Sequence, residues 1–157
     1  MLGFTLYFDG DLDGAHDAAS AGLKLSDPDP YLYYLEAVTL LKSNGRQHAQ
    51  ILSDLAAAEK NIPACALCYV ASGKTREQQN NLPGALSDFQ AAVKLAPGMP
   101  EGWYHLASAY DRIGRKADAA QARERFQKTK ANDDEREKEM IRGFFLQSLG
   151  AQGPGPR

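Results

Sequence analysis

Apolar residues recur along the chain with the period of an amphipathic α-helix. Tyr31, Tyr34 and Leu35, for example, fall on one face of a helix with 3.6 residues per turn. Just before them, Asp29 followed by Pro30 predicts a helix N-cap with proline at the first helical position. Similar segments follow one another through most of the 157 residues, so the pattern predicts an all-α protein.

Four turn signals separate these helical segments at nearly constant intervals. Gly10, Gly45, Asn80 and Gly114 each lie between two predicted helices, and the intervals between them are 35, 35 and 34 residues. A period of 20 to 50 residues is typical of repeat proteins, in which each helix pair buries its apolar face against the next pair. The sequence therefore predicts stacked helix pairs.

Two of the repeats carry a specific order of small and bulky residues. In the third repeat Gly73 takes the small-residue position of the first helix, and Ala85 and Phe89 supply an A-x3-F pattern in the second. In the fourth repeat, the first helix has an aromatic, a leucine, a small residue and a tyrosine at Trp103, Leu106, Ala107 and Tyr110. This order resembles the tetratricopeptide repeat (TPR) family. The resemblance implies a right-handed solenoid of antiparallel helix pairs.

Extending this register over the chain gives repeats at residues 1–28, 29–64, 65–99 and 100–131. The second repeat is degenerate, because Val38 stands where a small residue is usual and Asp54 where an aromatic is expected. The first is partial, because Gly3 takes the small position and an intact first helix would need residues before Met1. We therefore expect this chain to be the C-terminal part of a longer repeat protein.

Residues 132–149 predict a final helix that covers the last repeat. An acidic first turn suits the positive end of a helix dipole, and apolar residues three to five positions apart form one stripe: Met140, Ile141, Phe144, Phe145 and Leu149. A solenoid must cover its exposed last pair, so we expect a capping helix at 132–149. Residues 150–157 are expected to be a disordered tail.

Charge and hydropathy argue against nucleic acid and membrane partners. The chain has 18 Lys and Arg against 20 Asp and Glu, a formal charge of −2, so no positive field favours nucleic acid or anionic lipid. No apolar run approaches the ~20 residues of a membrane-spanning helix. We predict no nucleic acid binding and no membrane insertion, and the compartment stays open.

The motif with the most chemical character is Cys65-Ala66-Leu67-Cys68. A C-x-x-C can be a redox pair, half of a metal site or a disulfide. A structural zinc site usually takes four ligands, and His16, His48 and His105 fall in different repeats. We interpret the cysteines mainly as small packing residues at the start of a helix, with a disulfide left open. No catalytic site, metal or cofactor is predicted.

The resemblance implies that the first helix of each pair lines a concave groove in which peptides or helices bind. In this register the lining residues are Thr39, Lys42, Ser43, Val70, Lys74, Glu77, Gln78, Glu101, Tyr104, Ser108 and Arg112. The chain departs from the Lys and Asn clamp of TPR proteins that bind chaperone tails. The clamp needs Lys or Asn at positions where this sequence has Leu35, Thr39, Val70 and Ser108.

These features predict a non-catalytic scaffold that binds a protein or peptide. The alternative is the regulatory repeat portion of a larger enzyme or sensor, whose catalytic domain lies outside this chain. Self-association through the truncated first repeat is a further hypothesis, because its apolar residues Leu2 to Phe8 lack their usual neighbour.

Overall fold

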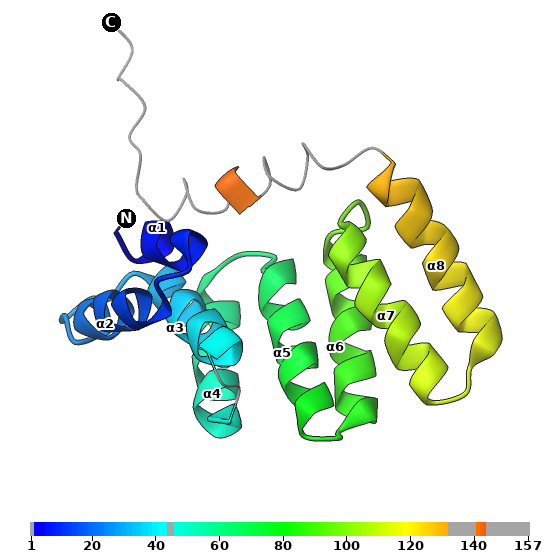
Figure 1. The fold of residues 1–157 in the computed structure, drawn as a ribbon, viewed down its shortest axis with the longest axis horizontal. Helices are drawn as coiled ribbons and strands as arrows, with labels where there is room; N and C mark the ends of the chain where they lie inside the picture. The colour runs from blue at the N-terminus through cyan, green and yellow to red at the C-terminus, as the bar shows by residue number, and fades with distance from the viewer. Residues whose placement is uncertain (1, 44–45, 132–140, 144–157) are drawn as a thin grey trace, which may run out of the picture.

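The computed structural model describes residues 2–43, 46–131 and 141–143, and within these residues the chain is helical with no strand. The helices are α1 (Leu2–Asp9), α2 (Leu12–Leu23), α3 (Pro30–Ser43), α4 (His48–Asn61), α5 (Ala66–Gln78), α6 (Leu82–Leu95), α7 (Pro100–Arg112) and α8 (Lys116–Lys130). Each helix packs against the next, and α1, α3, α5 and α7 also contact one another in succession (Figure 1). The odd-numbered helices therefore form one layer of a stack of helix pairs, and the all-α prediction is confirmed.

Three of the four predicted turns share one backbone geometry. Gly10, Asn80 and Gly114 have positive φ angles of 87°, 59° and 79°. The residue directly after each of these positions donates its backbone N–H to the carbonyl of the residue five places before it, at 2.9 Å in all three turns. This hydrogen bond is typical of the Schellman motif that ends a helix. Glycine adopts a positive φ at little cost and asparagine tolerates it, which explains these residue types. The fourth turn, at Gly45, lies outside the described residues.

In two of these turns, the residue that follows the positive-φ position is also the N-cap of the next helix. The Asp11 carboxylate accepts the N–H of Gly14 at 2.9 Å, and the Asn81 side chain accepts that of Gly84 at 3.1 Å. Asp29 accepts the backbone N–H two residues later at 3.0 Å, so the predicted N-cap is confirmed. These caps satisfy N–H groups that have no partner within the helix. Local hydrogen bonds therefore start these three helices.

A small residue opposite a large one lets the helices of a pair approach closely. Phe89 on α6 is fully buried, and a Cβ at Gly73 on α5 would lie only 2.7 Å from its Cδ1 and 2.8 Å from its Cζ. Ala85 and Ala92, on the same helix as Phe89, are also fully buried. Only glycine leaves room for the ring at residue 73, because protein interiors are close-packed. This contact is the physical reason for the pattern in the third repeat.

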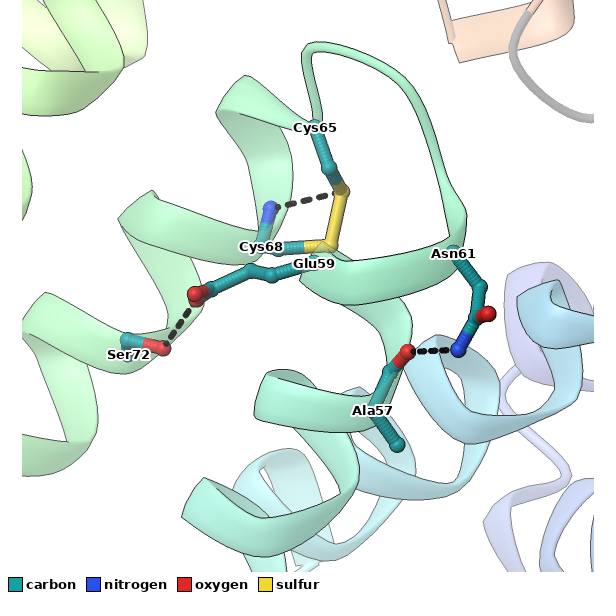
Figure 2. The surroundings of a disulfide bond; sticks show 6 residues. All are labelled: Ala57, Glu59, Asn61, Cys65, Cys68 and Ser72. Carbon is teal, nitrogen blue, oxygen red and sulfur yellow. Dashed lines mark hydrogen bonds between the residues drawn. A yellow bond between two sulfur atoms is a disulfide. The ribbon is translucent and has the colours of Figure 1, made fainter.

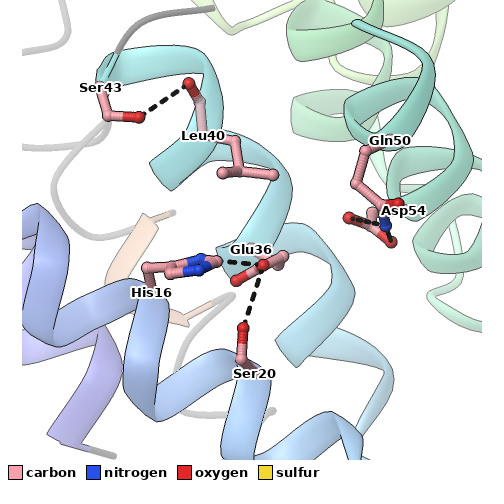
Figure 3. Close-up of polar contacts among 7 residues, drawn as sticks. All are labelled: His16, Ser20, Glu36, Leu40, Ser43, Gln50 and Asp54. Carbon is pink, nitrogen blue, oxygen red and sulfur yellow. Dashed lines mark hydrogen bonds and ion pairs between the residues drawn. The ribbon is translucent and has the colours of Figure 1, made fainter. Parts of the chain in front are cut away.

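The degenerate second repeat buries acidic side chains that find partners within the chain. Asp54 is 5% exposed, and Gln50 donates to its two carboxylate oxygens at 2.9 and 3.0 Å (Figure 3). Burial raises the pKa of Asp54. On α3, Glu36 accepts a hydrogen bond from Ser20 at 3.2 Å, and its carboxylate lies 2.9 Å from Nδ1 of His16. The Glu36 contacts join α2 to α3, whereas Gln50 and Asp54 both lie on α4.

Most of the predicted capping helix and all of the predicted tail lie outside the described residues. Residues 141–143 are helical, whereas 132–140 and 144–157 are not described, so the capping helix at 132–149 stays a prediction. Within the described parts of the chain, the helices are too short or too polar for any of them to cross a membrane.

Candidate functional site

The layer of odd-numbered helices encloses a cavity of about 420 Å³. Its walls come from α1, α3, α5, the start of α7 and the turn at residues 141–143, and they include Tyr7, Phe8, Tyr34, Val38, Leu41, Lys42, Leu67, Val70, Ala71, Lys74, Gln78, Glu101 and Ile141. We call this cavity the groove. Sites of 300 to 1,000 Å³ with mostly apolar walls are typical of specific ligand binding. The groove is therefore the candidate functional site.

The floor of the groove is apolar and its rim is charged. Val38, Leu67 and Val70 are at most 9% exposed and belong to the hydrophobic core. At the rim the Lys74 ammonium lies 3.9 Å from a carboxylate oxygen of Glu101. An apolar floor binds an apolar side chain, and charges at the rim select the sequence around it.

Two tyrosines add neutral hydroxyl groups to this surface. Burial raises the pKa of Tyr34 far above its usual value, and the Glu101 carboxylate and Tyr7 raise it further. The pKa of Tyr7 is raised first by burial and then by Glu101. Both phenols therefore keep their protons at neutral pH. The Lys42 ammonium lies 4.7 Å from the centre of the Tyr7 ring, a cation–π contact that holds both side chains at the rim.

The structure brings together five of the eleven lining residues predicted from the sequence. Those that line the groove are Lys42, Val70, Lys74, Gln78 and Glu101. Thr39 does not line it, which corrects the expectation from the register: its side chain packs between helices and is 1% exposed. A partner could reach Thr39 only if the helices moved apart.

The other predicted residues lie beside the groove or farther along the stack. The Arg112 guanidinium lies 3.3 Å from a carboxylate oxygen of Glu77, an ion pair that joins α7 to α5. Tyr104 and Ser108 line a second, more open cavity of about 300 Å³ between α7 and α8, together with Phe126. Tyr104 therefore lines the second cavity, whereas Arg112 lines neither of the two.

Sequence reasoning missed the contribution of helix α1. Tyr7 and Phe8 line the groove from α1. They lie 35 residues before Lys42 and Ser43, so the repeat period would have placed them on the lining face. Phe8 and Leu2 are also 56% and 67% exposed. Self-association through α1 stays a prediction.

The two cysteines form a disulfide at the start of α5 (Figure 2). Cys65 is the N-cap of the helix, its sulfur accepts the backbone N–H of Cys68 at 3.3 Å, and both residues are buried. Nearby, Ser72 donates to Glu59 at 3.2 Å and connects α5 to α4. The bridge is thus built into the packing of α4 and α5, and neither cysteine lines the groove. Of the alternatives that the sequence left open, the structure contains the disulfide.

The histidines occupy three different environments. His105 stacks on Phe89 with ring centres 5.3 Å apart, and burial, with a smaller effect from Lys74, lowers its pKa to about 4. His48 lies 3.3 Å from the side-chain oxygen of Gln78, and His16 pairs with Glu36. Within the described residues, no group of three or more His, Cys, Asp or Glu side chains could hold a metal ion.

Comparison with solved structures places this arrangement among known repeat proteins. MamA from Desulfovibrio magneticus RS-1, from its residue 41 to the end, is 25% identical with a TM-score of 0.72, over 84% of this chain and 73% of that one. A crystal structure of MamA with 15% identity has a TM-score of 0.73, over 83% of this chain and 75% of that one. The chain has a tetratricopeptide-repeat fold. The predicted TPR architecture is therefore confirmed.

A third solved structure has the same fold. YrrB, described as a TPR protein with an unusual peptide-binding site, is 18% identical with a TM-score of 0.68, over 96% of this chain and 70% of that one. A scan against protein-family models and a search of curated proteins gave no significant match. The likeness to TPR proteins thus rests on the arrangement of the helices and on the repeat pattern.

Proposed function

We propose that this TPR chain is a non-catalytic interaction module that binds a peptide or helix of another protein in the groove. The observation that carries the proposal is the groove itself, a cavity of about 420 Å³ with an apolar floor and charged rim, built by α1, α3, α5 and α7. The peptide-binding site of YrrB supports a ligand of this kind for the fold. A scaffold role follows, because the groove offers shape and charge without a group activated for chemistry.

The groove favours one apolar anchor and mixed charges around it. The floor accepts an aliphatic or aromatic side chain, while Lys42 and Lys74 attract carboxylates and Glu101 attracts a basic group. A chaperone tail ending in a carboxylate would instead need the Lys and Asn clamp, which this chain does not reproduce. We therefore propose an internal peptide or amphipathic helix as the ligand.

A selection of binding peptides tests this proposal. Sixteen-residue random peptides displayed on phage would be selected on the full chain, and the dissociation constants of the enriched peptides measured by fluorescence anisotropy. Lys74→Glu should weaken binding about tenfold, because it reverses a charge at the rim. Lys94→Glu on α6 makes the same charge change at an exposed position outside the groove, so it should leave binding unchanged. Peptides whose affinity is the same for all three proteins would contradict binding in the groove.

A further inference from the structure

The turn at residues 141–143 lies against the groove. Ile141 is half-buried, lines the groove with Tyr7, Tyr34 and Leu67, and packs against the core formed by α1, α3 and α5. Its neighbours Arg142 and Gly143 are exposed, and a Cβ at Gly143 would meet no other atom within 4 Å. Of the three residues in this helical turn, which is drawn in orange in Figure 1, Ile141 is therefore the one that lines the groove.

This position differs from the one that a capping helix would give. A helix that covers the last repeat would contact α7 and α8, where Tyr104 and Phe126 line the second cavity. Tyr104 is 56% exposed, so this surface is still open to solvent. Ile141 instead contacts the core at the other end of the stack, on the surface that an external ligand would use.

We propose that the chain's own C-terminal segment occupies the groove, with Ile141 as its apolar anchor, and competes there with the external ligand. This inference rests on the proposed function, because it assigns the same site an internal occupant. The sequence around Ile141 fits the groove: apolar residues recur in helical spacing from Met140 to Leu149, and residues 133–139 hold five acidic and two basic side chains. The acidic excess complements Lys42 and Lys74 at the rim.

Because the C-terminal segment is part of the same chain, one half-buried anchor is sufficient for it to occupy the groove. A segment on the same chain acts at an effective concentration in the millimolar range, so even a weak contact fills the groove for much of the time. An external ligand then binds only the fraction of molecules whose groove is empty, and its apparent dissociation constant rises in inverse proportion to that fraction. Weakening the internal anchor therefore strengthens external binding.

A synthetic peptide with the sequence of residues 132–149, labelled with fluorescein, is the appropriate probe. Ile141→Ala in the full chain removes most of the internal anchor, and we expect this variant to bind the peptide roughly tenfold more tightly than the original chain. Arg142→Ala, at the exposed neighbouring position, should bind it as the original chain does. Equal affinity of Ile141→Ala and the original chain would overturn the proposal.

Methyl NMR tests the internal contact without any ligand. The chain contains four isoleucines, so the δ1 methyl of Ile141 can be assigned by comparison with Ile141→Val. Occupancy predicts nuclear Overhauser effects between this methyl and the Tyr7 or Tyr34 ring, with a ring-current shift. Their absence would overturn the internal occupant but not the proposed function, which fails separately if peptide binding is insensitive to Lys74→Glu.

Discussion

Replacing Gly73 by alanine tests the contact that determines the spacing of α5 and α6. The new Cβ would lie 2.7 Å from Cδ1 and 2.8 Å from Cζ of Phe89, closer than Cβ atoms approach other carbons in proteins. The ring cannot easily turn aside, because Phe89 is 0% exposed and its ring stacks on that of His105. Either the two helices separate or the ring leaves its preferred rotamer.

The magnitude follows from two opposing effects. Overpacking a close-packed core costs about 1–3 kcal/mol, whereas alanine is favoured over glycine within a helix by about 1 kcal/mol. The new Cβ would approach the buried ring to less than 3.0 Å, so we place the overpacking cost in the upper part of this range, about 2–3 kcal/mol. After subtracting about 1 kcal/mol for the helix preference of alanine, we expect Gly73→Ala to lower the free energy of unfolding by about 1–2 kcal/mol. The melting temperature should fall by about 2–4 °C for each kcal/mol.

Urea unfolding followed by circular dichroism measures this change. Gly98→Ala is the matched control, because no atom lies within 4 Å of its Cβ and its φ is negative, so the free energy should fall little or rise slightly. In a double-mutant cycle, Phe89→Leu should reduce the cost of Gly73→Ala, since the smaller side chain leaves room for the methyl group. A Gly73→Ala protein as stable as the original chain would refute this account of the small-residue position.

Two further predictions concern buried groups away from the groove. The folded-state pKa of His105 is about 4 and its unfolded value about 6.5, so the unfolded chain binds more protons between these values, and stability should fall as pH decreases from 6.5 to 4. Urea unfolding at pH 7 and pH 4 measures this change in the free energy of unfolding, and His105→Gln should reduce it by roughly 2–3 kcal/mol. An NMR titration midpoint near 6.5 for His105 would contradict its burial. Reduction of the Cys65–Cys68 bridge should lower the free energy of unfolding by about 2 kcal/mol, because a four-residue loop loses its constraint on the unfolded chain. Thermal melts with and without reductant measure this change. The double variant Cys65→Ala/Cys68→Ala is the control, and its melting temperature should not depend on reductant. If reductant opens the bridge but leaves the melting temperature of the original chain unchanged, the expected contribution is contradicted.

Much of the fold could be predicted from the sequence because the interactions that form it are local. Gly10, Asn80 and Gly114 end helices through their own backbone conformation, and Asp29 caps the helix that follows it at once. Such signals act over a few residues, so their spacing of 34 or 35 residues is visible before any tertiary contact is known. The period then implies the stack.

The candidate site was predicted less completely, because the spacing between repeats is not constant on the lining face. The register predicted from the sequence pairs Thr39 with Lys74, 35 residues apart, yet Thr39 is buried, and it is Val38, 36 residues before Lys74, that lines the groove with it. Helix α1, as the first element of the stack, contributes Tyr7 and Phe8 to the same cavity. A repeat register predicts which face of each helix lines the groove, but it does not predict how exposed each side chain on that face is.

The sequence by itself determined the helices, the turns and the pairing of small with bulky residues, because each of these depends on neighbouring residues or on a repeated pattern. The tertiary structure decided that Cys65 and Cys68 are bridged, that Thr39 is enclosed, and that Ile141 reaches the groove. For Ile141 the physical reason is distance along the chain. Ile141 meets Tyr7 and Tyr34 only after the stack has brought segments more than 100 residues apart into one cavity, and no local pattern specifies that meeting.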